Sequence, residues 1–192
     1  MLHGSAINYQ GEAVLFVGDS GAGKSSLSTA FRLKGYSVLT DDVCVIEMNE
    51  EQHPIALPGY PQSKLWEEAL ENLSIDYKEL KKVRSKIGKR AMPIKDAFCK
   101  KTLPIKAIYW LNIHNQDNIL IEVIKGGDKF GVIKNMTYRR AWLDGFGVQK
   151  SHFKNGMLLT NKIPIKKITR TNNRFCVDEI VQLVLNDLSN NN

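Results

Sequence analysis

The stretch that decides the fold is residues 13–26, which read Ala13-Val14-Leu15-Phe16-Val17-Gly18-Asp19-Ser20-Gly21-Ala22-Gly23-Lys24-Ser25-Ser26. The first five residues are an apolar run that predicts a buried strand, and residues 18–25 match the pattern G-x-x-x-x-G-K-[ST] in full. Residues 26–34 then carry apolar side chains at helical spacing, and Gly35 is placed to end the helix. Strand, loop and helix therefore follow one another in the order of a phosphate-binding loop.

The residue types of this loop suit the binding of a nucleotide. Glycines let backbone N–H groups curl around an anion, and the following helix adds the positive end of its dipole. We expect Lys24 to reach the β- and γ-phosphates and the hydroxyl of Ser25 to ligate Mg²⁺. ATP and Mg²⁺ are thus the predicted cofactors. The predicted ATP-binding residues are Gly18, Asp19, Ser20, Gly21, Ala22, Gly23, Lys24, Ser25 and Ser26.

Two adjacent acids, Asp41-Asp42, end the predicted strand that follows the loop's helix. In a strand-helix-strand unit with a parallel pair, they lie at the carboxyl edge of the sheet, beside the loop. One carboxylate can hold Mg²⁺ with Ser25, and the other can accept the proton of a hydroxyl nucleophile. Neighbouring side chains of a strand point to opposite faces, so both can serve only if the chain turns there. An Asp-Asp turn without a chemical role is the alternative.

The remaining pattern predicts an α/β fold with a mixed sheet and flanking helices, as one domain over residues 1–192. Three prolines make residues 53–61 a loop or an edge strand. The predicted strands are 5–9, 13–17, 36–40, 43–46, 105–113, 119–124 and 163–169. The predicted helices are 26–34, 64–73 and 178–188, with mostly helical structure over 129–140 and 141–159.

The charge is concentrated in one segment. The chain has 27 Lys and Arg against 20 Asp and Glu, a net charge of +7, and residues 78–106 hold eleven basic residues against two acids. Such a block predicts an anionic partner. Basic side chains can also clamp a transferring phosphoryl group, and the candidates are Lys89, Arg90, Arg139, Arg140 and Arg170. Nucleic acid is not expected as the primary partner, because Tyr77 and Phe98 are the only aromatic residues in or beside the block.

Cysteine usage and hydropathy predict a cytoplasmic protein with no membrane partner. Cys44, Cys99 and Cys176 lie far apart and form no CxxC pair, which favours a reducing compartment. The longest clean apolar run, residues 13–17, is far shorter than the roughly 20 residues that span a bilayer.

The order of His3-Gly4, a strand hairpin, Gly-Asp-Ser-Gly-Ala-Gly-Lys-Ser at 18–25, a helix ending at Lys34-Gly35, and Asp41-Asp42 resembles the catalytic domain of HPr kinase/phosphorylase and its relatives. These relatives share a nucleotide-binding core with phosphoenolpyruvate carboxykinases. The resemblance is clear over residues 3–46. It continues more faintly through Lys89-Arg90, residues 104–111 and Thr137-Tyr138-Arg139. HPr-kinase-like proteins of peptide-modification clusters, including lasso-peptide kinases, look most similar.

This resemblance implies an ATP- and Mg²⁺-dependent kinase that phosphorylates a serine hydroxyl of a protein or peptide. By it, Asp42 matches the proton acceptor, Asp41 its acidic neighbour near the metal, and His3 a histidine near the reacting phosphate. Lys24 matches the phosphate lysine, and Ser25 and Asp41 the metal-binding pair. The relatives form hexamers, so a homo-oligomer is implied as well. The Gly-rich signature segment of HPr kinase is not visible, so the resemblance leaves open both phosphorylase activity and HPr as substrate. By this resemblance, we expect the chain to be either a short family member or a catalytic domain.

Two other functions stay open from the residues alone. A small-molecule kinase of the shikimate- or nucleotide-kinase type also places an acid on the strand after the loop helix, and its Arg-rich lid could correspond to the basic block. A regulatory module that binds a nucleotide without transferring phosphate would need the same loop.

Overall fold

The computed structural model describes residues 1–190. The strands are β1 (Leu2–Tyr9), β2 (Glu12–Gly18), β3 (Val38–Thr40), β4 (Val43–Met48), β5 (Pro54–Leu57), β6 (Gln62–Trp66), β7 (Lys81–Lys82), β8 (Lys89–Pro93), β9 (Leu103–His114), β10 (Leu120–Val123) and β11 (Ile165–Thr171). The helices are α1 (Lys24–Leu33), α2 (Glu67–Asn72), α3 (Asp128–Asn135), α4 (Trp142–Gly145), α5 (Gln149–Lys162), α6 (Val177–Ser189) and the 3₁₀ turn η1 (Lys95–Ala97).

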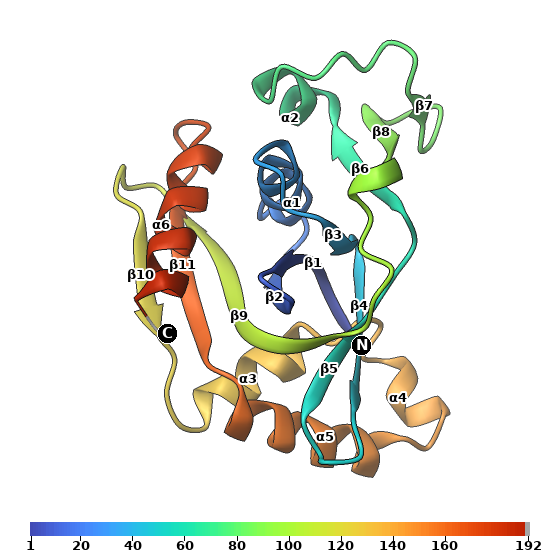
Figure 1. Cartoon of the computed structure of the whole chain (residues 1–192), viewed down its shortest axis with the longest axis vertical. Helices are drawn as coiled ribbons and strands as arrows, with labels where there is room; N and C mark the ends of the chain where they lie inside the picture. The colour runs from blue at the N-terminus through green and yellow to red at the C-terminus, as the bar shows by residue number, and fades with distance from the viewer. Residues whose placement is uncertain (191–192) are drawn as a thin grey trace.

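Eight strands form one mixed sheet, which confirms the predicted α/β fold with flanking helices (Figure 1). The strand order is β10-β11-β9-β2-β1-β4-β5, and β3 pairs with β1. β1 and β2 make the predicted antiparallel hairpin, whereas β2, β9 and β11 run parallel. The carboxyl ends of these three parallel strands therefore share one edge of the sheet, where ligands bind in open α/β sheets.

The unit β2-α1-β3 is not a directly paired strand-helix-strand unit, because β1 lies between its two strands. β1 is antiparallel to both β2 and β3. The two strands thus have the same direction, and their carboxyl ends lie at the same edge although they share no hydrogen bond. The predicted position of Asp41-Asp42 beside the loop is correct, but the direct pairing that led to it is wrong.

β9 is a long bent strand that pairs with β11 and β2 and, at its start, with the last strand in the order, β5 (Figure 1). It pairs with β2 over most of its length and with β5 at its start, where Ile55 lies opposite Pro104. β5 also pairs with β4. Residues 54–57 are consequently a strand with partners on both sides, neither a loop nor an edge strand.

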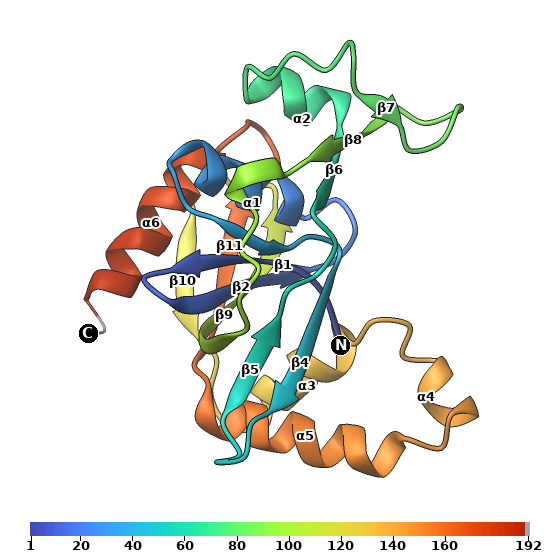
Figure 2. The same ribbon diagram turned by 45° about the vertical axis from the view of Figure 1, so that its right-hand side comes forward.

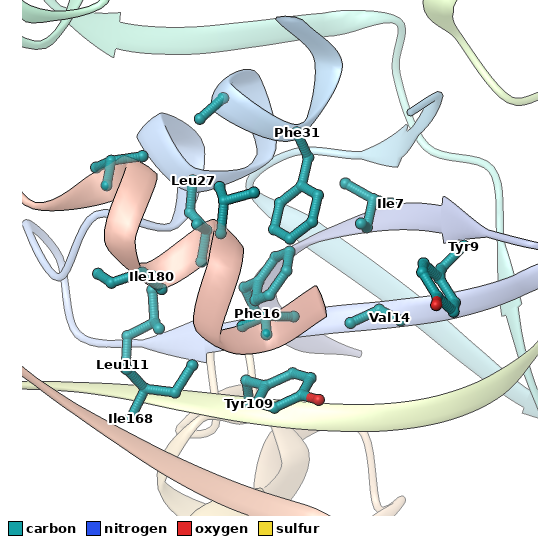
Figure 3. Close-up of a cluster of buried hydrophobic side chains, with 14 of the residues drawn as sticks. Ile7, Tyr9, Val14, Phe16, Leu27, Phe31, Tyr109, Leu111, Ile168 and Ile180 are labelled. Atoms are coloured by element: carbon teal, nitrogen blue, oxygen red, sulfur yellow. The ribbon is translucent and has the colours of Figure 1, made fainter. Parts of the chain in front are cut away.

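Helices cover both faces of β2. Val14 and Phe16 pack into a cluster with α1 and α6, where Phe16 stacks on Phe31 at 5.4 Å between ring centroids (Figure 3). The alternate residue Leu15 packs into a second cluster with α3 and α5. A strand buried on both faces has no polar positions, which explains the unbroken apolar run at 13–17.

One further local prediction was wrong. Residues 62–66 form a strand rather than helix: Ser63 and Leu65 are buried and alternate with outward side chains, and only 67–72 are helical. The basic block, for which no strand was predicted, contains β7 and β8, and β8 pairs with both β6 and β7 in a small sheet that stands above the main body (Figure 2). The mostly helical structure predicted over 141–159 is confirmed and is divided into α4 and α5, with Gly147 between them at φ 65°.

No helix within residues 1–190 is long and apolar enough to cross a membrane. The three cysteines are unpaired and buried.

Candidate active site

The glycine-rich loop (residues 18–25) links β2 to α1 and depends on two of its glycines. A Cβ on Gly18 would stand 2.7 Å from the carbonyl oxygen of Leu111, so only glycine lets the loop pass so close to β9. Gly23 precedes the first residue of α1 with φ 102°, a left-handed conformation that favours glycine. These residues turn the loop so that α1 begins at Lys24, with its amino end toward the loop.

Lys24 closes the loop on itself. Its ammonium group donates to the carbonyl oxygens of Gly18 and Asp19, both at 2.8 Å. Burial lowers the pKa of this ammonium group, and the carboxylates of Asp41 and Asp19 oppose that shift. The charge is therefore held at the centre of the loop by carbonyl oxygens and nearby carboxylates.

Two further side chains brace the loop from outside. Arg170, at the end of β11, donates from Nε to the carbonyl of Ala22 at 2.9 Å and from Nη2 to that of Gly21 at 3.2 Å. The buried hydroxyl of Ser5 donates to the carbonyl of Lys24 at 3.0 Å. The sequence predicted Arg170 as a phosphate clamp, but its guanidinium group donates to the loop backbone and to the carbonyl oxygen of Thr171. The sequence analysis missed Ser5, since nothing local distinguishes a serine in a strand.

Asp41 and Asp42 follow β3, and the chain turns between them. Asp42 has φ 86°, a left-handed conformation that Asp and Asn tolerate better than most residues. This turn meets the condition that both carboxylates can face one site. Asp42 is half-exposed, whereas Asp41 is 7% exposed.

The buried carboxylate of Asp41 is only partly satisfied. Its Oδ2 accepts the backbone N–H of Lys64 at 3.1 Å, and its Oδ1 has no hydrogen-bond partner among residues 1–190. Burial raises the pKa of Asp41, while the Lys64 N–H and the hydroxyl of Ser25 oppose the rise. An unsatisfied buried carboxylate oxygen beside a serine hydroxyl is a fit for a hard cation.

His3 lies against Asp42 from β1. Its Nδ1 is 3.0 Å from the carbonyl oxygen of Asp42 and 3.6 Å from its carboxylate. Burial lowers the pKa of His3, as does the nearby charge of Lys24, and both effects favour the neutral ring. A carbonyl can only accept, so we assign the proton to Nδ1, which leaves Nε2 as a bare acceptor.

These groups line a cavity of about 210 Å³ between the glycine-rich loop and the small sheet, which we call the catalytic cavity. Its lining includes Lys24, Ser25, His3 and Asp42, together with Lys64 of β6 and Lys89 of β8. Lys89 is the one candidate of the basic block that reaches it.

Lys64 touches both acids, because its ammonium group lies 3.0 Å from Oδ2 of Asp42 while its backbone binds Asp41. The sequence analysis did not identify Lys64 as a site residue, because it predicted a helix over 64–73. The alternation of buried Ser63 and Leu65 is the signal that could have revealed a strand with Lys64 facing the site.

The other predicted clamps do not line the catalytic cavity. Arg90 is paired with Glu67 at 2.7 Å and donates to the carbonyl of Leu80 at 2.9 Å, which anchors β8 to α2. Arg139 stacks over Trp142, with 4.3 Å between guanidinium and ring. Arg140 lines a separate hollow beside α4.

The donor set suits Mg²⁺ bound together with a nucleotide. No group of three His, Cys, Asp or Glu side chains within the described chain could hold a metal ion by itself. Mg²⁺ in phosphoryl-transfer sites is commonly held by one or two protein oxygens, with substrate phosphates and water completing the shell. Asp41 and Ser25 offer such a pair.

Comparisons with known proteins support the fold. No protein-family model and no curated protein sequence matches the chain. Among solved structures, the HPr(Ser) kinase/phosphatase from Coxiella burnetii aligns over 96% of this chain and 88% of its own, with a TM-score of 0.50 and 15% sequence identity. The chain therefore has the fold of that kinase/phosphatase, as the sequence resemblance predicted.

Proposed function

We propose that the protein is an ATP- and Mg²⁺-dependent kinase that transfers the γ-phosphoryl group to a serine hydroxyl of a protein or peptide. The observation that carries this proposal is the gathering of Lys24, Ser25, Asp42 and His3 around one cavity, with the buried carboxylate of Asp41 beside Ser25. The likeness to a solved kinase/phosphatase supports the same class of reaction.

The glycine-rich loop is assigned to the triphosphate. Its backbone N–H groups and the amino end of α1 present partial positive charge, and Lys24 adds a full charge at the loop's centre. Mg²⁺ would neutralise charge on the β- and γ-phosphates when bound by Ser25 and Asp41. Lys64 and Lys89 face the same cavity and stabilise the negative charge of the transferring group.

Asp42 is the proposed general base. Its carboxylate accepts the proton of the serine hydroxyl as the hydroxyl oxygen attacks the γ-phosphorus, and the bond from that phosphorus to the β,γ-bridging oxygen breaks to release ADP. The left-handed turn at Asp42 and the contact with His3 hold the carboxylate at the cavity.

The test is transfer of radioactive γ-phosphate from ATP in an extract of the source organism, separated into macromolecules and metabolites. We expect Mg²⁺-dependent label in the macromolecular fraction as acid-stable phosphoserine. Asp42→Asn should abolish the label while ATP binding is retained, because asparagine keeps the turn but accepts no proton. Lys24→Ala should lose both ATP binding and the transfer of label.

Other outcomes point to other functions. Label confined to the metabolite fraction would identify a small-molecule kinase. ATP binding without label in either fraction would identify a non-catalytic module. Undiminished transfer by Asp42→Asn would refute the assigned base.

A further inference from the structure

A second cavity adjoins the glycine-rich loop on the side away from Asp42. It has a volume of about 400 Å³ and lies between α1, α2 and the loop that joins β11 to α6, which we call the α6 loop (residues 172–176). These three segments lie at the same end of the molecule (Figures 1 and 2). The volume falls within the range of roughly 300–1,000 Å³ that is common for small-molecule sites.

This second cavity adjoins the catalytic cavity. Both are lined by Gly21, Gly23, Ser26 and Trp66. The glycine-rich loop thus forms the floor of one groove, with the acids at one end and the second cavity at the other. A triphosphate that places its γ-phosphate beside Asp42 extends its remaining phosphates toward the second cavity.

The walls of the second cavity suit a flat, partly apolar group. Its base is made of buried side chains, among them Leu27 of α1 and Ile180 of α6. Two exposed aromatic rings stand at its mouth on different elements: Trp66, 48% exposed, before α2, and Phe175, 40% exposed, in the α6 loop. An exposed aromatic ring beside an apolar hollow offers a stacking surface for a nucleobase.

The α6 loop is held in place by polar contacts, so Phe175 is presented from a fixed support. The side chain of Asn173 donates to the carbonyl of Asn115 at 3.1 Å and to the carboxylate of Asp117 at 2.9 Å. Arg174 pairs with Glu179 in the first turn of α6. These contacts restrain the two residues that precede Phe175 and reduce the ordering cost of a bound ligand.

We propose that the second cavity binds the nucleoside part of the nucleotide, with its base stacked on Phe175. This assignment rests on the proposed function, because it takes its direction from the γ-phosphate end of the groove. Phe175 is then a residue that binds substrate without touching the reacting phosphate.

The test separates the nucleoside from the phosphate chain. Binding of ADP and of inorganic tripolyphosphate, both with Mg²⁺, is measured by calorimetry for the wild type and for Phe175→Ala. We expect the variant to bind ADP roughly tenfold more weakly, as for loss of one stacked base, and tripolyphosphate equally well. Phe175→Tyr should restore ADP affinity. The control is Phe146→Ala, a phenylalanine 71% exposed just after α4 that lines neither cavity.

Each other outcome is decisive. Unchanged ADP affinity in Phe175→Ala overturns the assignment. An equal loss of affinity for ADP and tripolyphosphate also overturns it, because that result shows only damage to the loop. If the wild type binds tripolyphosphate, Lys24→Ala does not, and Phe175→Ala has no effect, the kinase proposal stands and the nucleoside assignment is refuted. A wild type that binds neither ligand removes the kinase proposal itself.

Discussion

Replacing Asp41 by asparagine should make the metal-free protein more stable. The Asp41 carboxylate is buried, its Oδ1 has no hydrogen-bond partner among residues 1–190, and burial raises its pKa above the ordinary value of 3.8. The folded protein therefore binds this proton more tightly than the unfolded chain does. Asparagine keeps an acceptor for the Lys64 N–H but carries no charge.

The size of the effect follows from the burial. An unsatisfied buried polar group costs about 1–3 kcal/mol. For a chain of this length, 1 kcal/mol changes Tm by about 2–4 °C. We expect Asp41→Asn to unfold several degrees above the wild type in EDTA, and to have lost Mg²⁺-dependent transfer.

The pH dependence gives the sharper test. A carboxyl with a raised folded-state pKa stabilises the fold less and less as pH rises from its unfolded pKa to its folded pKa. The Tm difference between Asp41→Asn and the wild type should thus widen with rising pH, beginning just above 3.8 and levelling off above the folded-state pKa. Asp42→Asn is the matched control, because Asp42 is half-exposed and asparagine tolerates its left-handed turn. A lower Tm for Asp41→Asn at all pH values would refute the reasoning and make Asp41 a structural anchor.

Two more substitutions test the packing and the cavity. Asp187→Ala should destabilise the protein by about 3 kcal/mol in urea unfolding, because it leaves the buried ammonium group of Lys166 and the hydroxyl of Tyr109 without their 2.6 Å acceptor. Lys64→Met should lower kcat for phosphate transfer about 10²-fold by removing a charge 3.0 Å from Asp42, with little change in stability.

Controls and contradicting results are available for both. Asp178 lies on the same helix as Asp187 and forms an exposed ion pair with Lys34. Asp178→Ala breaks that pair and should lower the free energy of unfolding by less than about 1 kcal/mol. An equal cost for Asp178→Ala and Asp187→Ala would contradict the importance given to burial. A Lys64→Met enzyme with normal kcat would show that the ammonium group has no part in transfer.

The part of the site that lies close together in the sequence could be predicted from it. The glycine spacing and the Lys-Ser pair of residues 18–25 predict a phosphate-binding loop, and the helix follows directly in the sequence. The acid pair could be located because a strand and a helix of ordinary length bring the chain back to the same edge of the sheet. The predicted position of the acid pair is correct although β1 lies between β2 and β3, because β2 and β3 still run in the same direction.

The part contributed by distant segments could not be predicted in this way. Lys64 reaches the acids only because β6 pairs with β8 across 23 or more residues, and Arg170 reaches the loop from 148 residues away. Arg90 and Lys89 are adjacent in the basic block, yet pairing turns one toward Glu67 and the other toward the catalytic cavity. No local pattern distinguishes them, since alternation along a strand assigns faces only once the strand's partners are known.

The sequence by itself thus determined the loop, its helix, the acid pair and the mixed α/β class, because each depends on contacts between neighbours or on one short return of the chain. Only the tertiary structure decided which lysines enter the catalytic cavity, which arginine braces the loop, and where the groove continues past the phosphates. Those features depend on strand pairing between remote segments, whose free energy comes from burial shared by many residues rather than from any one of them.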